Sequence, residues 1–290
     1  MSMDISQPSF FQRLRTCIKT ATPKALKTAW WLIRITLPVT FLVFILNYTG
    51  ILAIVSAYLS PFFRYLGLPG QSAFVLITSM LANIYSSIAV LSTLQMPVRD
   101  GVILASMCLV AHAFLIETAV LRKTGSSAVR MILLRIITSL VAGVLLNQIL
   151  PPMEGTVKAI SETVAGGFRE QFIAWASGIL ALCARILLLV WSLLFLQRIM
   201  VEFGWLELLS RNLNPLMKAM GLPASVTFSW IVANVVGLAY GSAIMIEESE
   251  QGRMNREDAD LLNHHIAVSH SQLEDPLLFL TIGLPIHWLM

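Results

Sequence analysis

Long, predominantly apolar segments constrain the fold of this chain more than any motif does. Residues 30–46 and 186–195 are two examples, and other segments approach the roughly 20 apolar residues that a membrane-spanning helix needs. Only 12% of the 290 residues are charged, against about 25% in a typical soluble domain. The strands of a β-barrel would alternate in polarity, and these segments do not. We therefore predict a polytopic α-helical membrane protein.

Other classes lack their signatures. The three cysteines, Cys17, Cys108 and Cys183, are far apart in sequence and form no CxxC pair, which argues against a disulfide framework or a thiolate zinc site. No phosphate loop, dinucleotide fingerprint, HExxH or GxSxG motif is present, so we do not expect an enzyme. The formal net charge of +4 reflects basic residues near helix ends and predicts topology, not binding to nucleic acid.

The distribution of polar residues divides the chain. We predict a basic, cytoplasmic N-terminal segment (1–29), a first transmembrane repeat with a linker helix (30–150), a polar connection (151–170) and a second transmembrane repeat (171–290). Residues 51–66 are apolar but short, and whether they cross the membrane stays open. If they cross, most of the basic residues lie on one side and the two repeats are inverted.

The evidence for a repeat is an ungapped match between the halves. With a shift of 154, residues 50–74 fall on 204–228, and nine of these 25 positions are identical. Glycine and proline account for four of the nine: Gly50/Gly204, Pro61/Pro215, Gly67/Gly221 and Pro69/Pro223. Because glycine and proline determine backbone shape, their recurrence indicates a recurring fold. Duplicated halves are typical of secondary transporters, whose sites lie between the repeats.

A histidine and a carboxylate recur in the same way. With a shift of 158, His112 falls on His270 and Glu117 on Asp275. Glu274 follows His270 by four residues, a spacing that places both on one face of a helix, and Asp275 precedes Pro276, where we expect a kink. Ionisable side chains at membrane depth are costly and mark functional sites by default. The alternative is that they form hydrogen bonds that fasten helices together.

Polar residues also interrupt two apolar segments near their midpoints. Asn83, Ser86 and Ser87 lie within residues 71–94, and Asn234, Tyr240 and Ser242 lie within residues 223–246. Such groups suit hydrogen bonding to a polar solute, and nearby glycines allow a helix to unwind. Helix packing through small residues is an equally good reading. By contrast, we expect Arg34, Arg135 and Arg185 to lie near helix ends and reach towards the membrane surface.

Two kinds of cation, a metal ion or a proton, suit the histidine and carboxylate residues. Imidazole and carboxylate groups bind Zn, Mn or Fe, so His112, Glu117, His270 and Asp275 are possible metal ligands. The same residues serve a proton-coupled mechanism, since histidine titrates near neutral pH. We predict no resident cofactor, and the sequence leaves the choice between a coupling proton and another cation open.

The chain resembles the nucleoside-recognition, or Gate, membrane proteins. The resemblance rests on Gly67-Leu68-Pro69 and Gly221-Leu222-Pro223 before segments with polar centres, and on the stretches at 111–118 and 269–275. That group includes the spore maturation proteins A and B and the membrane part of ferrous-iron transporters. The resemblance implies a bacterial inner-membrane protein that moves, or gates the movement of, a small solute or ion. It also allows homo- or hetero-oligomers with another Gate-type protein.

These observations lead to one fold and two functions. The predicted fold is all-α and polytopic, built from two inverted repeats with broken or re-entrant helices. The leading function is a secondary transporter or gated permease for a small polar solute or ion. Its site would consist of His112, Glu117, His270, Glu274 and Asp275 together with the polar residues of the two interrupted segments. The alternative is a non-transporting assembly or partner subunit of a Gate-type complex.

Overall fold

The protein is an all-α membrane protein. A computed structural model describes residues 9–159 and 167–290, so the first eight residues of the basic segment and residues 160–166 of the polar connection lie outside it. The first half contains α1 (Phe10–Tyr48), α2 (Ile51–Arg64), α3 (Ser72–Leu81), α4 (Ile84–Leu91), α5 (Val98–Val110), α6 (Phe114–Lys123) and α7 (Ala128–Ile149). The second contains α8 (Phe168–Glu202), α9 (Trp205–Ala219), η1 (Ala224–Val226), α10 (Thr227–Val235), α11 (Leu238–Glu250), α12 (Arg256–Ser269), α13 (Asp275–Leu278), η2 (Phe279–Ile282) and η3 (Ile286–Trp288).

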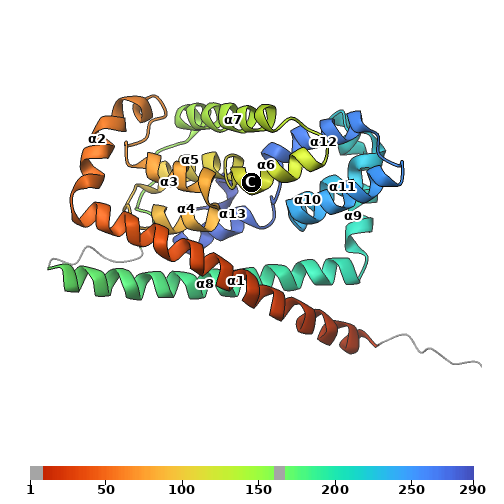
Figure 1. Cartoon of the computed structure of the whole chain (residues 1–290), viewed down its shortest axis with the longest axis horizontal. Coiled ribbons are helices and arrows are strands. Elements are labelled where there is room, and N and C mark those ends of the chain that lie inside the picture. Colours follow the sequence, from red (N-terminus) through yellow and green to blue (C-terminus); the bar gives the residue numbers. More distant parts are fainter. Residues whose placement is uncertain (1–8, 160–166) are drawn as a thin grey trace, which may run out of the picture.

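Four helical segments of the described chain are long and apolar enough to cross a bilayer. They are α1, the broken helix formed by α5 and α6, α7 and α8. The helices α1 and α8 pack against each other and run in opposite directions along one side of the molecule (Figure 1). Residues 10–29 of the basic segment belong to α1, which continues without a break across Trp30.

Two shorter helices lie across the ends of the long ones. In Figure 1, α2 and α9 stand at opposite ends of the molecule and run across the direction of α7 and α8. Each follows a glycine with a positive φ, Gly50 at 76° and Gly204 at 69°, which allows the chain to turn sharply after a long helix. In this arrangement residues 51–64 do not run alongside the long helices. Whether they cross the membrane stays open.

The two interrupted segments are hairpins. We expected each to be a span with polar residues at its midpoint, but α3 packs against α4 and α10 against α11, so each segment folds back at its polar residues. A Cβ at Gly241 would lie 2.5 Å from that of Ala233, whereas eight residues of straight helix extend about 12 Å. The reading of each segment as a single span is therefore wrong, and the expected interruption of these helices is confirmed.

The order of elements is the same in both halves. A long helix, a crosswise helix, a hairpin and a broken helix follow one another in each, and Gly67 and Gly221 have φ of 70° and 78° at matching positions. The antiparallel course of α1 and α8 is the relation that inversion requires. The duplication itself stays a prediction.

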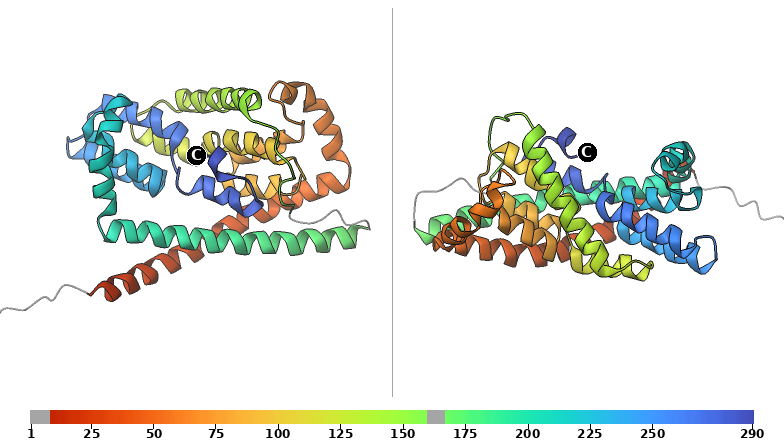
Figure 2. Two further views of the ribbon diagram at one scale, coloured as in Figure 1. Left: turned by 180° about the vertical axis from the view of Figure 1, so that it is seen from behind. Right: turned by 90° about the horizontal axis from the view of Figure 1, so that it is seen from above.

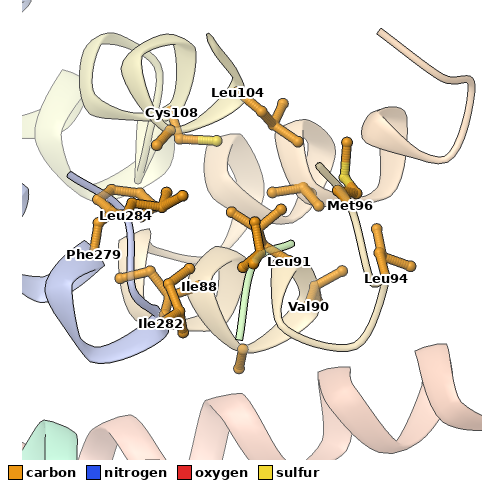
Figure 3. Close-up of a cluster of buried hydrophobic side chains, with 14 of the residues drawn as sticks. Ile88, Val90, Leu91, Leu94, Met96, Leu104, Cys108, Phe279, Ile282 and Leu284 are labelled. Carbon is orange, nitrogen blue, oxygen red and sulfur yellow. The ribbon is translucent and has the colours of Figure 1, made fainter. Parts of the chain in front are cut away.

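The chain ends against the first hairpin. Ile88 and Leu91 of α4 meet Cys108 of α5, and Phe279 and Leu284 from the C-terminal segment complete this core (Figure 3). The view from behind shows the C-terminal segment between the long helices and α7 (Figure 2). The last segment of the second half therefore helps to position the hairpin and the broken helix of the first.

Candidate functional site

The site forms where the two broken helices are interrupted. In the first, α5 ends at Val110 and α6 begins at Phe114, with Ala113 in a left-handed conformation (φ 45°). In the second, α12 ends at Ser269 and α13 begins at Asp275, with Ser271 left-handed (φ 56°). Left-handed conformations are unfavourable for residues other than glycine, and they gather at functional sites.

Each interruption is hydrogen-bonded to a hairpin of its own half. The backbone N–H of Ala113 donates to the carbonyl of Ser79 at 2.8 Å, and that of Ser271 donates to the carbonyl of Ala233 at 3.2 Å. In the two registers of the repeat, Ser79 corresponds to Ala233 and Ala113 to Ser271. These bonds satisfy backbone groups that the broken helices leave without an intrahelical partner. They also link each hairpin to the adjacent interruption.

The two histidines face each other between the interruptions. Their Nε2 atoms are 3.1 Å apart and their ring centroids 4.9 Å apart. The opposite nitrogen of each ring bonds a backbone carbonyl four residues earlier. His112 Nδ1 is 3.0 Å from the Cys108 oxygen, and His270 Nδ1 is 2.8 Å from the Ile266 oxygen. Both rings are buried, and the same kind of hydrogen bond orients each of them.

Two carboxylates complete the cluster. Glu117 Oε1 is 3.0 Å from His112 Nε2 and 3.2 Å from His270 Nε2. Asp275 Oδ2 is 3.3 Å from His112 Nε2. The structure thus brings together the four residues that the sequence predicts as possible metal ligands. We call them the His–acid cluster.

Arg135 of α7 is the site residue that the sequence analysis missed. The prediction that it lies near a helix end and reaches the membrane surface is wrong, because its side chain is 0% exposed. Its Nη2 lies 2.7 Å from Glu117 Oε2 and donates to the His112 carbonyl at 2.8 Å, and its Nε donates to the Val110 carbonyl at 2.8 Å. Arg34 and Arg185 are exposed on their helices.

Glu274 does not lie beside His270 on one helix face, as we expected. The helix α12 ends at Ser269 and His270 caps it with an extended backbone, so His270 and Glu274 do not share a helix face, and the break precedes Asp275 and Pro276. Glu274 Oε1 instead accepts a hydrogen bond of 2.6 Å from the Tyr85 hydroxyl of α4. This contact joins the first hairpin to the second broken helix.

The polar residues of the hairpins have separate positions. Asn83 accepts from the Ser86 N–H at 2.8 Å and so caps α4, and the Ser87 hydroxyl donates to the Ile84 carbonyl at 2.7 Å. The Ser86 hydroxyl is 3.3 Å from that of Thr36 in α1. These contacts are local or directed at α1, and none of them reaches the His–acid cluster.

The second hairpin is similar in this respect. The Asn234 amide donates to the Trp230 carbonyl at 2.9 Å, and Ser242 is buried. Tyr240 is exposed, with the Lys24 ammonium 3.9 Å from its ring centroid. The proposal that these residues contact a solute therefore rests on their position in the hairpins.

Comparison with known proteins finds a family similarity over the first half of this site. Residues 29–128 match the Gate family, described as nucleoside recognition. The matched residues include the first hairpin and first broken helix, with His112 and Glu117, whereas His270 and Asp275 lie outside them. The expected resemblance to Gate membrane proteins is confirmed at this level.

One curated relative extends over nearly the whole chain. The uncharacterized membrane protein YvoD of Bacillus subtilis (strain 168) is 28% identical over 268 residues, covering 90% of this chain and 85% of that protein. No solved structure matches the chain. The chain is thus similar to Gate proteins over its first half and to a membrane protein over most of its length.

Proposed function

We propose that this protein is a secondary transporter or gated permease of the bacterial inner membrane for a small polar solute or ion. The observation that carries the proposal is the convergence of His112, Glu117, His270 and Asp275, from two separately broken helices, on one buried point. Secondary transporters place their sites in this way, at discontinuous helices between repeats.

The cluster's charge supports binding of a positive ion. With both carboxylates ionised and both imidazoles neutral, Glu117 and Asp275 contribute two negative charges and Arg135 one positive charge, a net charge of −1. Uncompensated charge is expensive in a low-dielectric interior. A proton or a small cation entering the cluster would compensate it, so occupancy of the site is coupled to its electrostatics.

Unpaired polar atoms beside the hairpins support passage of a polar cargo. Asn83 Nδ2, Asn234 Oδ1 and Arg135 Nη1 are buried and have no hydrogen-bond partner among the described residues. Each such atom costs about 1–3 kcal/mol when nothing satisfies it. Water or the polar groups of a solute would satisfy them during transport.

The links between hairpins and broken helices give a structural basis for gating. Tyr85 joins the first hairpin to Glu274, and the backbone bonds at Ala113 and Ser271 join each hairpin to the adjacent interruption. A change of charge in the cluster that moves either broken helix would therefore move both hairpins through these hydrogen bonds. The basic residues at the start of α1 support a cytoplasmic N-terminus.

Flux through purified protein in liposomes tests the proposal. Proteoliposomes would be supplied with labelled nucleosides, organic acids and divalent cations, with a pH-sensitive dye inside to report proton movement. We expect flux of at least one cargo above that of empty liposomes. We also expect its loss in the double variant His112→Ala, Glu117→Gln and its retention in Glu250→Gln, which changes an exposed acid far from the cluster in sequence.

Two outcomes contradict the proposal. Flux that is unchanged in the double variant would show that the His–acid cluster is not the site. Absence of all flux, together with co-purification of a second Gate-type protein, would favour the alternative of a partner subunit.

A further inference from the structure

We propose that the His–acid cluster binds one divalent transition-metal cation in four-coordinate, tetrahedral geometry. The inference names the ion class of the site described above, and the ion's role as cargo or coupling ion rests on the proposed function. It is carried by the direction of the ring nitrogens, by the spacing of the four donor atoms and by the position of Arg135.

The hydrogen bonds of the two rings direct their lone pairs towards each other. A backbone carbonyl can only accept, so the bonds of His112 Nδ1 to Cys108 and of His270 Nδ1 to Ile266 place the ring proton on Nδ1 in both residues. In the neutral rings each Nε2 then presents a lone pair, and neither can donate to the other across the 3.1 Å that separates them. Two facing lone pairs with two carboxylates form a set of electron-pair donors that a positive ion would complete.

This orientation is the one found in metal sites. A histidine that binds a metal nearly always donates its other ring N–H to a carbonyl or a carboxylate, which fixes the tautomer and the ring plane. Both histidines do so here, through bonds of 3.0 and 2.8 Å that span four residues. The recurrence at two positions 158 residues apart makes an accidental contact a poor explanation.

Four of the six donor-atom separations are close to those of a tetrahedron. Metal–ligand bonds of about 2.0–2.1 Å require neighbouring donor atoms to be about 3.3–3.4 Å apart. Four such separations are 3.0, 3.1, 3.2 and 3.3 Å. The donor atoms of His112, His270 and Asp275 all lie within 4.8 Å of one another. An ion would therefore enter with shifts of a few tenths of an ångström around Glu117 and the rings, and with a larger movement of Asp275 towards the other donor atoms.

Arg135 prepares Glu117 to bind through a single oxygen. Its guanidinium is bound to Oε2, which leaves Oε1 directed at both histidines. A divalent ion would change the net charge of the five side chains from −1 to +1, with both carboxylates in contact with positive groups. Arg135 is thus a positioning residue that acts through Glu117.

The donor set selects the class of ion. Two imidazole nitrogens and two carboxylate oxygens suit Zn²⁺, Mn²⁺ or Fe²⁺. Ca²⁺ and Mg²⁺ prefer shells of six or more oxygens, which this cluster does not offer. The nearby Cys108 takes part through its carbonyl, which accepts from His112.

Calorimetric titration of the purified, metal-free protein tests the inference. We expect one equivalent of Zn²⁺ or Mn²⁺ to bind per chain and Mg²⁺ not to bind under the same conditions. Asp275→Asn and His112→Ala should each weaken binding at least tenfold. His287→Gln, which removes an exposed histidine outside the cluster, should leave it unchanged.

X-ray absorption at the metal edge keeps the test independent of how well the variants fold. The wild-type complex should show imidazole scattering with nitrogen and oxygen ligands near 2.0 Å. Absence of stoichiometric binding, or a bound ion without imidazole ligands, would overturn the inference. Flux of another cargo without metal binding would overturn this inference and leave the proposed function standing. Metal binding without any flux would overturn the proposed function and leave this inference standing.

Discussion

His112 and His270, 158 residues apart in the chain, present their Nε2 atoms to each other at a distance of 3.1 Å. Each ring is fixed from behind by the carbonyl four residues earlier, and Glu117 Oε1 lies within 3.2 Å of both. Two interrupted helices are needed to bring these atoms together. An unbroken helix would separate the two rings, and Glu117 could not contact both of them.

Replacing Arg135 should destabilise the protein strongly. Arg135→Met removes the cation that compensates Glu117 and leaves two backbone carbonyls without a donor. Removal of one partner from a buried ion pair costs about 3–5 kcal/mol. The free energy of unfolding, measured by denaturant titration in micelles, should fall by that amount. Arg34→Met, at an exposed position, is the control and should change it little. Equal effects of the two substitutions would contradict the buried position of Arg135.

Removing the Tyr85 hydroxyl should loosen the first hairpin. Tyr85→Phe keeps the ring but deletes the 2.6 Å hydrogen bond to Glu274. A bond to a charged group contributes about 1.5–3 kcal/mol, so the unfolding free energy should fall within that range. Tyr58→Phe, at a side chain that is 86% exposed, provides the comparison. No difference between the two variants would show that the contact with Glu274 contributes nothing.

A methyl group at Gly241 should force the second hairpin apart. Its Cβ would meet Ala233 atoms at 2.5–2.9 Å, including backbone atoms that cannot move aside. Overpacking of this kind costs about 1–3 kcal/mol. Gly241→Ala should therefore lower the apparent melting temperature. Gly167→Ala should not, because its methyl group would meet only the end of Glu170, at 3.2 Å. An unchanged melting temperature in Gly241→Ala would contradict the hairpin, because a straight helix over residues 227–250 would tolerate the added methyl group.

The sequence predicted the cluster because the same pair of residue types recurs in both halves. His112 with Glu117 and His270 with Asp275 occupy matching positions at a shift of 158, and the cost of burying such groups required them to face protein or water. Arg135 was missed for the complementary reason. It lies on α7, outside the matched pairs of residues, and a linear sequence does not show which face of that helix meets the interruption at His112.

The hydropathy pattern could not predict that the two interrupted segments fold back as hairpins. An apolar segment of about 24 residues has the same composition whether it crosses the membrane or turns back, so residues 71–94 suggested a span. Local signals of the turn were present. Asn83 is a good N-cap residue and begins α4, and Gly237, with φ of 107°, precedes α11. In the same way, the spacing of His270 and Glu274 suggested one helix face, but the helix ends at Ser269.

As the proposed transport site, the His–acid cluster must lie on a path that water and cargo reach, and not in dry packing between helices. Hydrogen–deuterium exchange at the ring carbon of each histidine, followed by mass spectrometry of metal-free protein in lipid nanodiscs, measures this directly. The exposed His287 serves as the internal reference. We predict that His112 and His270 both exchange, because openings of the site admit water to the rings. Rings that remain unexchanged after His287 has exchanged fully would contradict the account.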